Sequence, residues 1–308
     1  MPSAFRLPME SLELEIYGRY RALVEKSDTF AGRTCPDGEP PRVRLSDIID
    51  KYDAFCFDGY GTLYNRGDFV YPGAKEWFAA LRRVGKEIRL VTNAASNLDQ
   101  ALADEADARG FDFTVAETIS SGSLLKGWLS GLPAGSPFDA GREVYYIGRA
   151  TGVNVLAECG IAAVENPVSP VVAISSSTAT DEMYAQSVSI LRRPGALLLV
   201  LNPDAWAPRI DGTRAPVSGE LCERLRRESG CAAEYFGKPF PGIWQKVRAT
   251  LPADAKAVMI GDTLGTDVYG AYVAGFDSAL VIGRNEPAAE LDADEKLLGV
   301  RPTYYLEP

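Results

Sequence analysis

Histidine is absent from the 308 residues of this sequence. Its absence excludes Ser-His-Asp and Cys-His nucleophile schemes and every metal site with an imidazole ligand. Any catalysis must use carboxylates, lysine, tyrosine, backbone amides or a metal bound through oxygen. Cysteine is also scarce, and without a Cys-x-x-Cys pair neither a zinc site nor a disulfide framework is expected. The cysteines, expected to be buried small apolar residues, are Cys35, Cys56, Cys159, Cys222 and Cys231.

Long basic runs and long apolar runs are missing too. The formal net charge is −10, and no lysine- and arginine-rich run could follow a phosphate backbone, which argues against nucleic acid and anionic membrane as partners. Apolar stretches such as 196–201 are too short to cross a bilayer, and residues 1–8 lack the apolar core of a signal peptide. We therefore expect a cytoplasmic protein.

Short apolar runs alternate with helical patterns along most of the chain. The expected strands are 54–57, 87–91, 143–147, 171–175, 196–201, 257–260 and 278–282. The expected helices include 11–27, 74–84, 152–159, 181–193, 220–229, 242–249 and 266–274. Strands that alternate with helices pair in parallel through right-handed crossovers, so we predict an α/β fold with a doubly wound, Rossmann-like parallel sheet. The length suggests two domains.

Polar residues that follow strands are the candidate site residues, because ligands bind at the carboxyl ends of such sheets. Asp58 follows the first strand, and Gly59 and Gly61 permit a tight loop with free amides. A carboxylate there could attack phosphorus or carbon, although a strand-ending Asp that caps a turn is the alternative. Thr92 and Asn93 follow the next strand and could bind phosphoryl oxygens or cap a helix.

Two further segments complete the set. Lys238, in Gly237-Lys238-Pro239, could neutralise a nucleophile and a phosphate, or could be a solvated turn lysine. Asp262 and Asp267 follow the strand 257–260, and with Asp58 they supply the oxygen ligands that Mg²⁺ prefers. Asp267 could instead cap the next helix, a role compatible with support of a metal ligand.

The order of these segments resembles the four motifs of the haloacid dehalogenase (HAD) superfamily, over roughly residues 52–283. The segments Tyr71-Pro72-Gly73-Ala74, Asn202-Pro203-Asp204 and Gly237-Lys238-Pro239-Phe240-Pro241 are similar to the NagD-like (class IIA) branch. The resemblance implies an α/β cap inserted between the second and third motifs, with Asn202 and Asp204 at positions that set substrate specificity. Asn-Pro-Asp is also an ordinary turn sequence.

This resemblance divides the chain into an N-terminal helical extension (1–45), a core (46–122 and 236–308) and a cap (123–235).

The first motif departs from the phosphatases of the superfamily, because Tyr60 occupies the place of their second Asp. A phenol with a pKa near ~10 is a poor base, and general acid–base help is worth about 10²–10⁴ in rate. The string 57–63 is similar instead to the L-2-haloacid dehalogenases, whose halide leaves without a proton. Ala94 also differs from a common Asn.

We predict a Mg²⁺-dependent hydrolase, a phosphatase that forms an aspartyl-phosphate on Asp58. Its expected catalytic residues are Asp58, Tyr60 and Lys238, and its expected metal ligands are Asp58, Tyr60 through its carbonyl, Asp262 and Asp267. The expected phosphate- or substrate-binding residues are Gly59, Gly61, Thr92, Asn93, Asn202 and Asp204. The expected partners are a small phosphorylated metabolite and, in a homodimer, a second copy of the chain. The alternatives are a metal-free dehalogenase and a non-catalytic phosphometabolite-binding protein.

Overall fold

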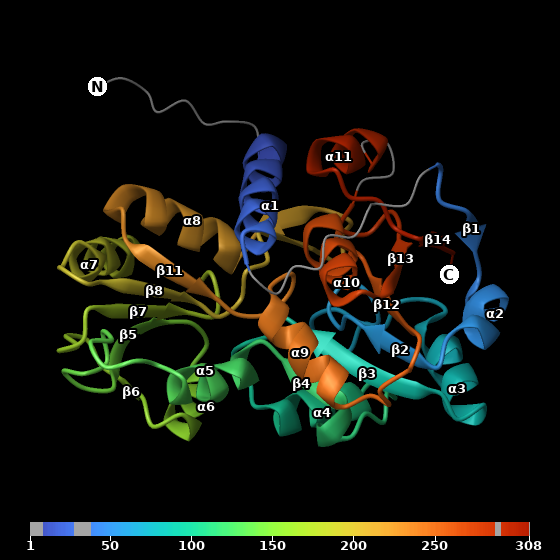
Figure 1. Ribbon diagram of the computed structural model, residues 1–308, viewed down its shortest axis with the longest axis horizontal. Helices are drawn as coiled ribbons and strands as arrows, with labels where there is room; N and C mark the ends of the chain where they lie inside the picture. The colour runs from blue at the N-terminus through green and yellow to red at the C-terminus, as the bar shows by residue number, and fades with distance from the viewer. Residues whose placement is uncertain (1–8, 28–37, 287–290, 308) are drawn as a thin grey trace.

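Two parallel sheets, each flanked by helices, make up the protein (Figure 1). The computed structural model describes residues 9–27, 38–286 and 291–307. The larger sheet has seven strands in the order β1-β14-β13-β12-β2-β3-β4, and the smaller has five in the order β11-β8-β7-β5-β6. All neighbouring strands within both sheets run parallel. The predicted α/β fold, a doubly wound sheet with an inserted α/β cap, is confirmed.

The larger sheet is buried on both faces. Its strands are β1 (Arg42–Val43), β2 (Ala54–Phe57), β3 (Glu87–Thr92), β4 (Thr118–Ser120), β12 (Ala257–Gly261), β13 (Asp277–Val281) and β14 (Tyr304–Leu306). Its helices are α2 (Leu45–Ile48), α3 (Ala74–Arg83), α4 (Asp99–Asp107), α9 (Pro241–Ala249), α10 (Tyr269–Ala274) and α11 (Leu291–Leu298). Successive side chains of a strand point to opposite faces. Accordingly, Phe55 and Phe57 pack with α3, while Ala54 and Cys56 pack with α9.

The smaller sheet belongs to the inserted cap. Its strands are β5 (Glu143–Ile147), β6 (Ala162–Ala163), β7 (Val171–Ile174), β8 (Leu197–Val200) and β11 (Ala232–Tyr235). The helices beside it are α5 (Leu125–Ser130), α6 (Gly152–Glu158), α7 (Asp181–Leu191) and α8 (Ser218–Ser229). An antiparallel hairpin, β9 (Trp206–Pro208) and β10 (Arg214–Pro216), extends from this part of the chain. The segment after β11 leads back to the larger sheet.

The N-terminal helix α1 (Met9–Glu25) lies between the two sheets, close to α8 and α11 (Figure 1). Its side chains Ile16, Tyr17 and Tyr20 are buried in one cluster with residues of both parts, among them Trp206 of the hairpin and Leu264 of the core. Ion pairs with cap residues add to this packing. The expected helix is therefore present, whereas residues 28–37, with Cys35, lie outside the described residues.

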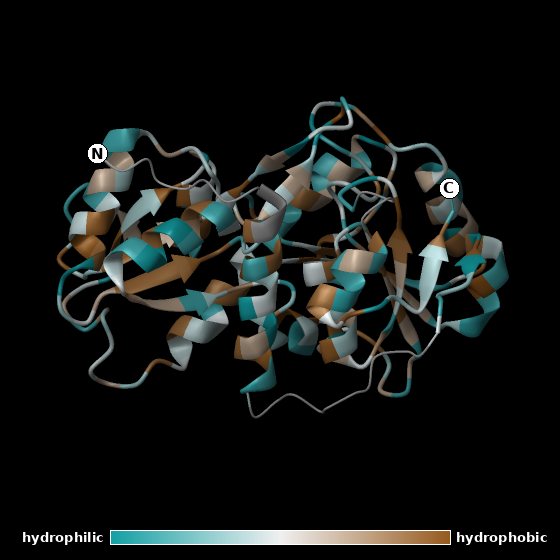
Figure 2. Cartoon of the chain, turned by 90° about the horizontal axis from the view of Figure 1, so that it is seen from above, coloured by the Kyte–Doolittle hydropathy of each residue, from teal (hydrophilic) through white to brown (hydrophobic). Residues whose placement is uncertain are grey.

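Apolar residues predominate on the strands and polar residues on many outward helix faces (Figure 2). Within the described part of the chain, no helix is long and apolar enough to cross a membrane. Cys56, Cys159 and Cys222 are buried free thiols, as expected, and Cys231 is partly buried.

Several elements differ from the sequence-based expectation. The strands β1, β4, β6 and β14 were not predicted, because two or three residues are too few to show a periodic pattern. The expected helix at 266–274 is divided, since residues Leu264–Val268 form a π-helical segment that precedes α10. Such segments are frequent at functional sites.

Candidate active site

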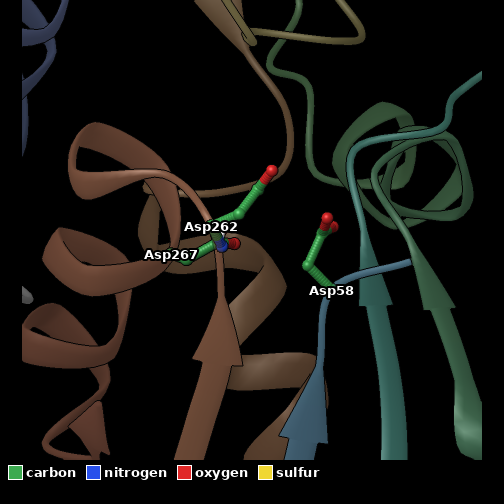
Figure 3. Close-up of side chains that lie close together, drawn as sticks. All are labelled: Asp58, Asp262 and Asp267. Carbon is green, nitrogen blue, oxygen red and sulfur yellow. Dashed lines mark hydrogen bonds between the residues drawn. The ribbon is translucent and has the colours of Figure 1, made fainter. Parts of the chain in front are cut away.

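Three adjacent strands deliver three candidate residues to one edge of the larger sheet. Asp58 follows β2, Thr92 ends β3, and Asp262 follows β12, in the strand order β12-β2-β3. Figure 3 shows Asp58 and Asp262 extending from neighbouring strand ends, with Asp267 beside Asp262. Oxygen atoms of these three buried carboxylates all lie within 4.8 Å of one another. They form a compact acidic cluster.

The loop after Asp58 depends on glycine at position 61. Gly61 has a φ of +97°, and a Cβ there would overlap Oδ2 of Asp262. The amides of Leu63 and Tyr64 both donate to the carbonyl of Gly59, at 2.9 and 3.1 Å, which closes the loop tightly. The N–H of Gly61 donates to the Tyr64 carbonyl (2.9 Å). That amide is therefore used by the turn, although the sequence suggested that it could contact phosphate.

Lys238 brings the positive charge of the site from the end of the cap segment. Its Nζ lies 2.5 Å from Oδ1 of Asp58 and 2.8 Å from Oδ1 of Asp267, and it donates to the carbonyl of Val91 (2.8 Å). Asn93 holds the backbone on both sides, accepting from the N–H of Lys238 at 2.8 Å and donating to its carbonyl at 3.0 Å. The lysine is 1% exposed, so it is not a solvated turn residue.

Asp267 supports the loop that carries Asp262. Its Oδ2 accepts hydrogen bonds from the N–H groups of Asp262 and Thr263, both at 3.1 Å, and its Oδ1 pairs with Lys238. Oδ2 is thus bonded to two backbone amides at the start of the π-helical segment, whereas Oδ1 is paired with the charge of Lys238. Asp267 is better suited to orienting Asp262 than to direct metal ligation.

The acidic cluster fits a divalent cation. Oδ2 of Asp262 is fully buried and has no hydrogen-bond partner among the described residues. Burying an unpaired carboxylate oxygen beside two other carboxylates is costly, and a hard cation with oxygen ligands offsets that cost. All three carboxylates lie close enough to share an ion, although the oxygens of Asp267 already face two backbone amides and Lys238.

Burial and mutual repulsion shift the pKa values of the acids. Burial raises the pKa of Asp58 to about 7; the attraction of Lys238 opposes the rise and repulsion by Asp267 adds to it. Burial and repulsion by Asp58 and Asp267 raise the pKa of Asp262 well above its ordinary value. Burial alone would lower the pKa of the Lys238 ammonium, but the surrounding carboxylates outweigh this and raise it. The lysine stays charged throughout the physiological range.

The hydroxyl of Tyr60 is bonded to a residue outside the acidic cluster. The phenol donates a hydrogen bond to Oε1 of Glu105 on α4, and that carboxylate also pairs with Arg109 at 3.1 Å. Burial, with the hydrogen bond to Glu105, raises the pKa of Tyr60 above its ordinary value. Glu105 was not identified from the sequence, because it lies 45 residues away on a helix and has no strand-end signal.

The cap loop 202–204 reaches the site through Asp204. Its Oδ1 accepts a hydrogen bond from Asn93 (2.8 Å), and burial raises its pKa to about 6 despite the attraction of Lys238. The side chain of Asn202 instead accepts from the N–H of Asp204 (2.9 Å), as in an ordinary Asx turn. Thr92 uses its hydroxyl oxygen to accept from the N–H of Ala94 (3.2 Å). The hydroxyl hydrogen of Thr92 can still donate to a ligand.

Three residues beyond β13 were missed by the sequence reasoning. Arg284 donates to the carbonyls of Gly61 and Thr62 and stacks on Tyr71, with its guanidinium 4.0 Å from the ring centroid. Asn285 and Glu286, the next two residues, bind the segment that follows Asp262. The sequence could have pointed to these three residues, because they are polar and follow the apolar run 278–282 after a single glycine.

Comparisons with known proteins agree with this arrangement. A family model described as haloacid dehalogenase-like hydrolase matches residues 55–162, and one described as HAD-hydrolase-like matches residues 235–307. Mouse chronophin is 29% identical over 281 residues, which cover 85% of this chain and 92% of chronophin. Ribonucleotide monophosphatase NagD of Escherichia coli K12 is 25% identical over 224 residues, 72% of this chain and 84% of NagD.

A solved structure is similar in the same way. The glycerol phosphate phosphatase of Mycobacterium tuberculosis in complex with magnesium superposes with a TM-score of 0.67 at 26% identity, over 84% of this chain and 76% of that protein. The first matched segment runs from the core through β5 of the smaller sheet, and the second begins at the last residue of β11 and continues into the core. This chain therefore belongs to the haloacid dehalogenase-like hydrolases, in the branch that includes NagD.

Proposed function

We propose that the protein is a Mg²⁺-dependent phosphatase that hydrolyses a small phosphorylated metabolite through an aspartyl-phosphate on Asp58. The observation that carries this proposal is the Asp58 carboxylate, which pairs with Lys238 and lies beside the carboxylates of Asp262 and Asp267. The relatives add support, because one is named a ribonucleotide monophosphatase and another is a glycerol phosphate phosphatase solved with magnesium. The net charge of −10 favours a small substrate over a nucleic acid.

The first step uses Asp58 as the nucleophile. A carboxylate oxygen of Asp58 attacks phosphorus, and the bond from phosphorus to the ester oxygen breaks. Lys238 and the Thr92 hydroxyl stabilise the phosphoryl oxygens during the transfer. Asn93 contributes indirectly, because it fixes the backbone of Lys238. Asp58, Asp262 and the carbonyl of Tyr60 would hold the cation, which when bound would neutralise phosphoryl charge.

The second step regenerates Asp58. Water attacks the phosphorus of the aspartyl-phosphate, and the products are inorganic phosphate and the Asp58 carboxylate. Because Tyr60 donates its hydroxyl hydrogen to Glu105, the leaving oxygen of the first step takes its proton from solvent. Esters whose leaving group needs no proton, such as aryl phosphates, should therefore turn over fastest.

The cap would select the substrate. We propose that residues 123–235 form this cap over a core of residues 46–122 and 236–308, with residues 1–45 as an extension. Asp204 is the cap residue next to the site, since it accepts from Asn93. We propose that Asp204 contacts the organic part of the substrate, and that Asn202 shapes the turn that presents it.

A panel of phosphate esters tests this function, run with Mg²⁺ and with EDTA, beside the Asp58→Asn variant. We expect hydrolysis only with Mg²⁺ and a loss of about 10³-fold or more in the variant. Tyr60 favours one rival, since a dehalogenase needs no acid at that position. Halide release from 2-haloacids in EDTA, with no phosphate release under any condition, would support that rival and refute the phosphatase.

A further inference from the structure

Three consecutive residues after β13 each bind a different part of the active-site loops. Arg284 donates to the carbonyls of Gly61 and Thr62 in the loop after Asp58. Glu286 accepts from the N–H of Leu264 at 2.7 Å. The segment 284–286 thereby braces both the nucleophile loop and the loop that begins at Asp262.

Asn285 acts on Asp262 through one intermediate side chain. Its Nδ2 donates to Oγ1 of Thr263 at 2.7 Å, and the Thr263 hydroxyl donates to Oδ1 of Asp262 at 3.2 Å. Since the hydroxyl accepts from Asn285, its single hydrogen is free to be directed at the carboxylate. Asn285 is 1% exposed, so no solvent competes for these bonds. These two hydrogen bonds fix Oδ1 of Asp262, whereas Oδ2 has no hydrogen-bond partner among the residues that the structure describes.

Arg214, on β10 of the hairpin, fixes Asn285 in turn. Its Nε donates to Oδ1 of Asn285 at 3.1 Å, which sets the amide so that its NH₂ group faces Thr263. The other end of the guanidinium pairs with Glu13 of α1 at 2.5 Å. Glu13 and Asn285 are buried, and Arg214 is largely so. A hydrogen-bonded path thus runs from α1 and the hairpin to Asp262.

We propose that Arg214 is a positioning residue that couples the placement of the hairpin to the cation site, through Asn285 and Thr263. The inference rests on the proposed function, because Asp262 is taken as a cation ligand. Carboxylate ligands need hydrogen-bonded partners to hold their orientation, and loss of such a partner commonly weakens metal affinity by about 10–100-fold. A hairpin that shifts would release Asn285, and Asp262 would then sample several orientations.

The test measures Mg²⁺ binding by calorimetry and by the Mg²⁺-induced shift in melting temperature. Arg214→Lys keeps a positive charge for Glu13 but lacks the Nε–H that reaches Asn285. Asn285→Ala removes the next link. We expect each variant to bind Mg²⁺ about 10-fold more weakly, and the double variant no more weakly than the poorer single one, because both break one path. The kcat at saturating Mg²⁺ should stay near that of the wild type.

A matched control is Arg209→Lys, an exposed arginine of the same hairpin that should keep wild-type affinity. Wild-type Mg²⁺ binding by Arg214→Lys, or fully additive losses in the double variant, would overturn the coupling. If Arg214→Lys folds poorly, the Mg²⁺ affinity of Asn285→Ala decides the test, and a wild-type affinity for that variant would likewise overturn the coupling. A wild-type protein that binds no Mg²⁺ would refute the cation site of the proposed function itself, and this inference with it.

Discussion

Nζ of Lys238 lies 2.5 Å from Oδ1 of Asp58 and 2.8 Å from Oδ1 of Asp267. One buried ammonium therefore faces the three carboxylates of the acidic cluster, and burial with mutual repulsion raises the pKa values of Asp58 and Asp262. A divalent cation would add positive charge to this group and favour the ionised form of each carboxylate.

The first prediction concerns Gly61. Gly61→Ala should abolish the Mg²⁺-induced rise in melting temperature and most activity, because the new Cβ overlaps Oδ2 of Asp262. Gly67→Ala is the matched control, since Gly67 also has a positive φ, +67°, but has no atom within 4 Å of a Cβ. The control should lose only about 1–2 kcal/mol of stability, from the left-handed backbone. Equal Mg²⁺ responses in the two variants would contradict the prediction.

The second prediction concerns the missing acid. Tyr60→Asp should raise phosphatase turnover by about tenfold or more on alkyl phosphates, because a carboxylate two residues after Asp58 can protonate the leaving group. Aryl phosphates should gain less. Tyr60→Phe, which removes only the hydrogen bond to Glu105, is the control. A tenfold fall in turnover of Tyr60→Asp, with folding and Mg²⁺ binding intact, would show that the phenol itself has a catalytic role.

The third prediction links the site to stability. The pKa of Asp58 is raised to about 7 in the folded protein, so its stabilising contribution is present below about pH 4 and is lost as pH rises through 7. In EDTA at pH 8, Asp58→Asn should therefore melt about 3 °C higher than the wild type. Asp254→Asn, at an exposed acid, is the control and should change little. A lower melting temperature for Asp58→Asn at pH 8 would disagree with this electrostatic account.

The fourth prediction concerns Glu286. Burial, with repulsion by Glu13, raises its pKa to about 8, so the wild type loses stability as pH rises from about 4.5 through 8. Glu286→Gln keeps an acceptor for the N–H of Leu264 and carries no charge. Its melting temperature should match the wild type at pH 5 and exceed it by about 3 °C at pH 9. Glu158→Gln, at an exposed position of α6, should show no such divergence. A constant difference in melting temperature between Glu286→Gln and the wild type from pH 5 to pH 9 would count against the raised pKa of Glu286.

The sequence predicted the parts of the site that follow from strand order. Asp58 and Asp262 could be placed together because parallel strands end at one edge and each acid directly follows an apolar run. Lys238 could be associated with these two acids only through the resemblance to the superfamily, because the strand that precedes it, β11, belongs to the smaller sheet. The choice between a solvated and a buried lysine depended on tertiary packing, which a single Gly-Lys-Pro string does not encode.

Other features were not predicted, each for a separate reason. The contact between Tyr60 and Glu105 depends on how α4 packs, and helical periodicity gives a buried face without naming its partner. The segment 284–286 could have been found with the strand-end rule, but that rule was not applied to the end of the expected strand 278–282. The π-helical turn at Leu264–Val268 arises from the loop that Asp267 holds.

The position of α1 has a consequence for the order in which the chain is completed on the ribosome. Arg21 of this helix bonds the carbonyl of Leu298, 277 residues later in the sequence. At about 5–20 residues per second, that interval takes roughly 15–55 s of synthesis. During this time the apolar side of α1, with Ile16 and Tyr20, lacks its final partners from α11. Helix α1 is thus synthesised long before it is fully packed, and the nascent chain must keep this surface from associating with other chains until α11 emerges.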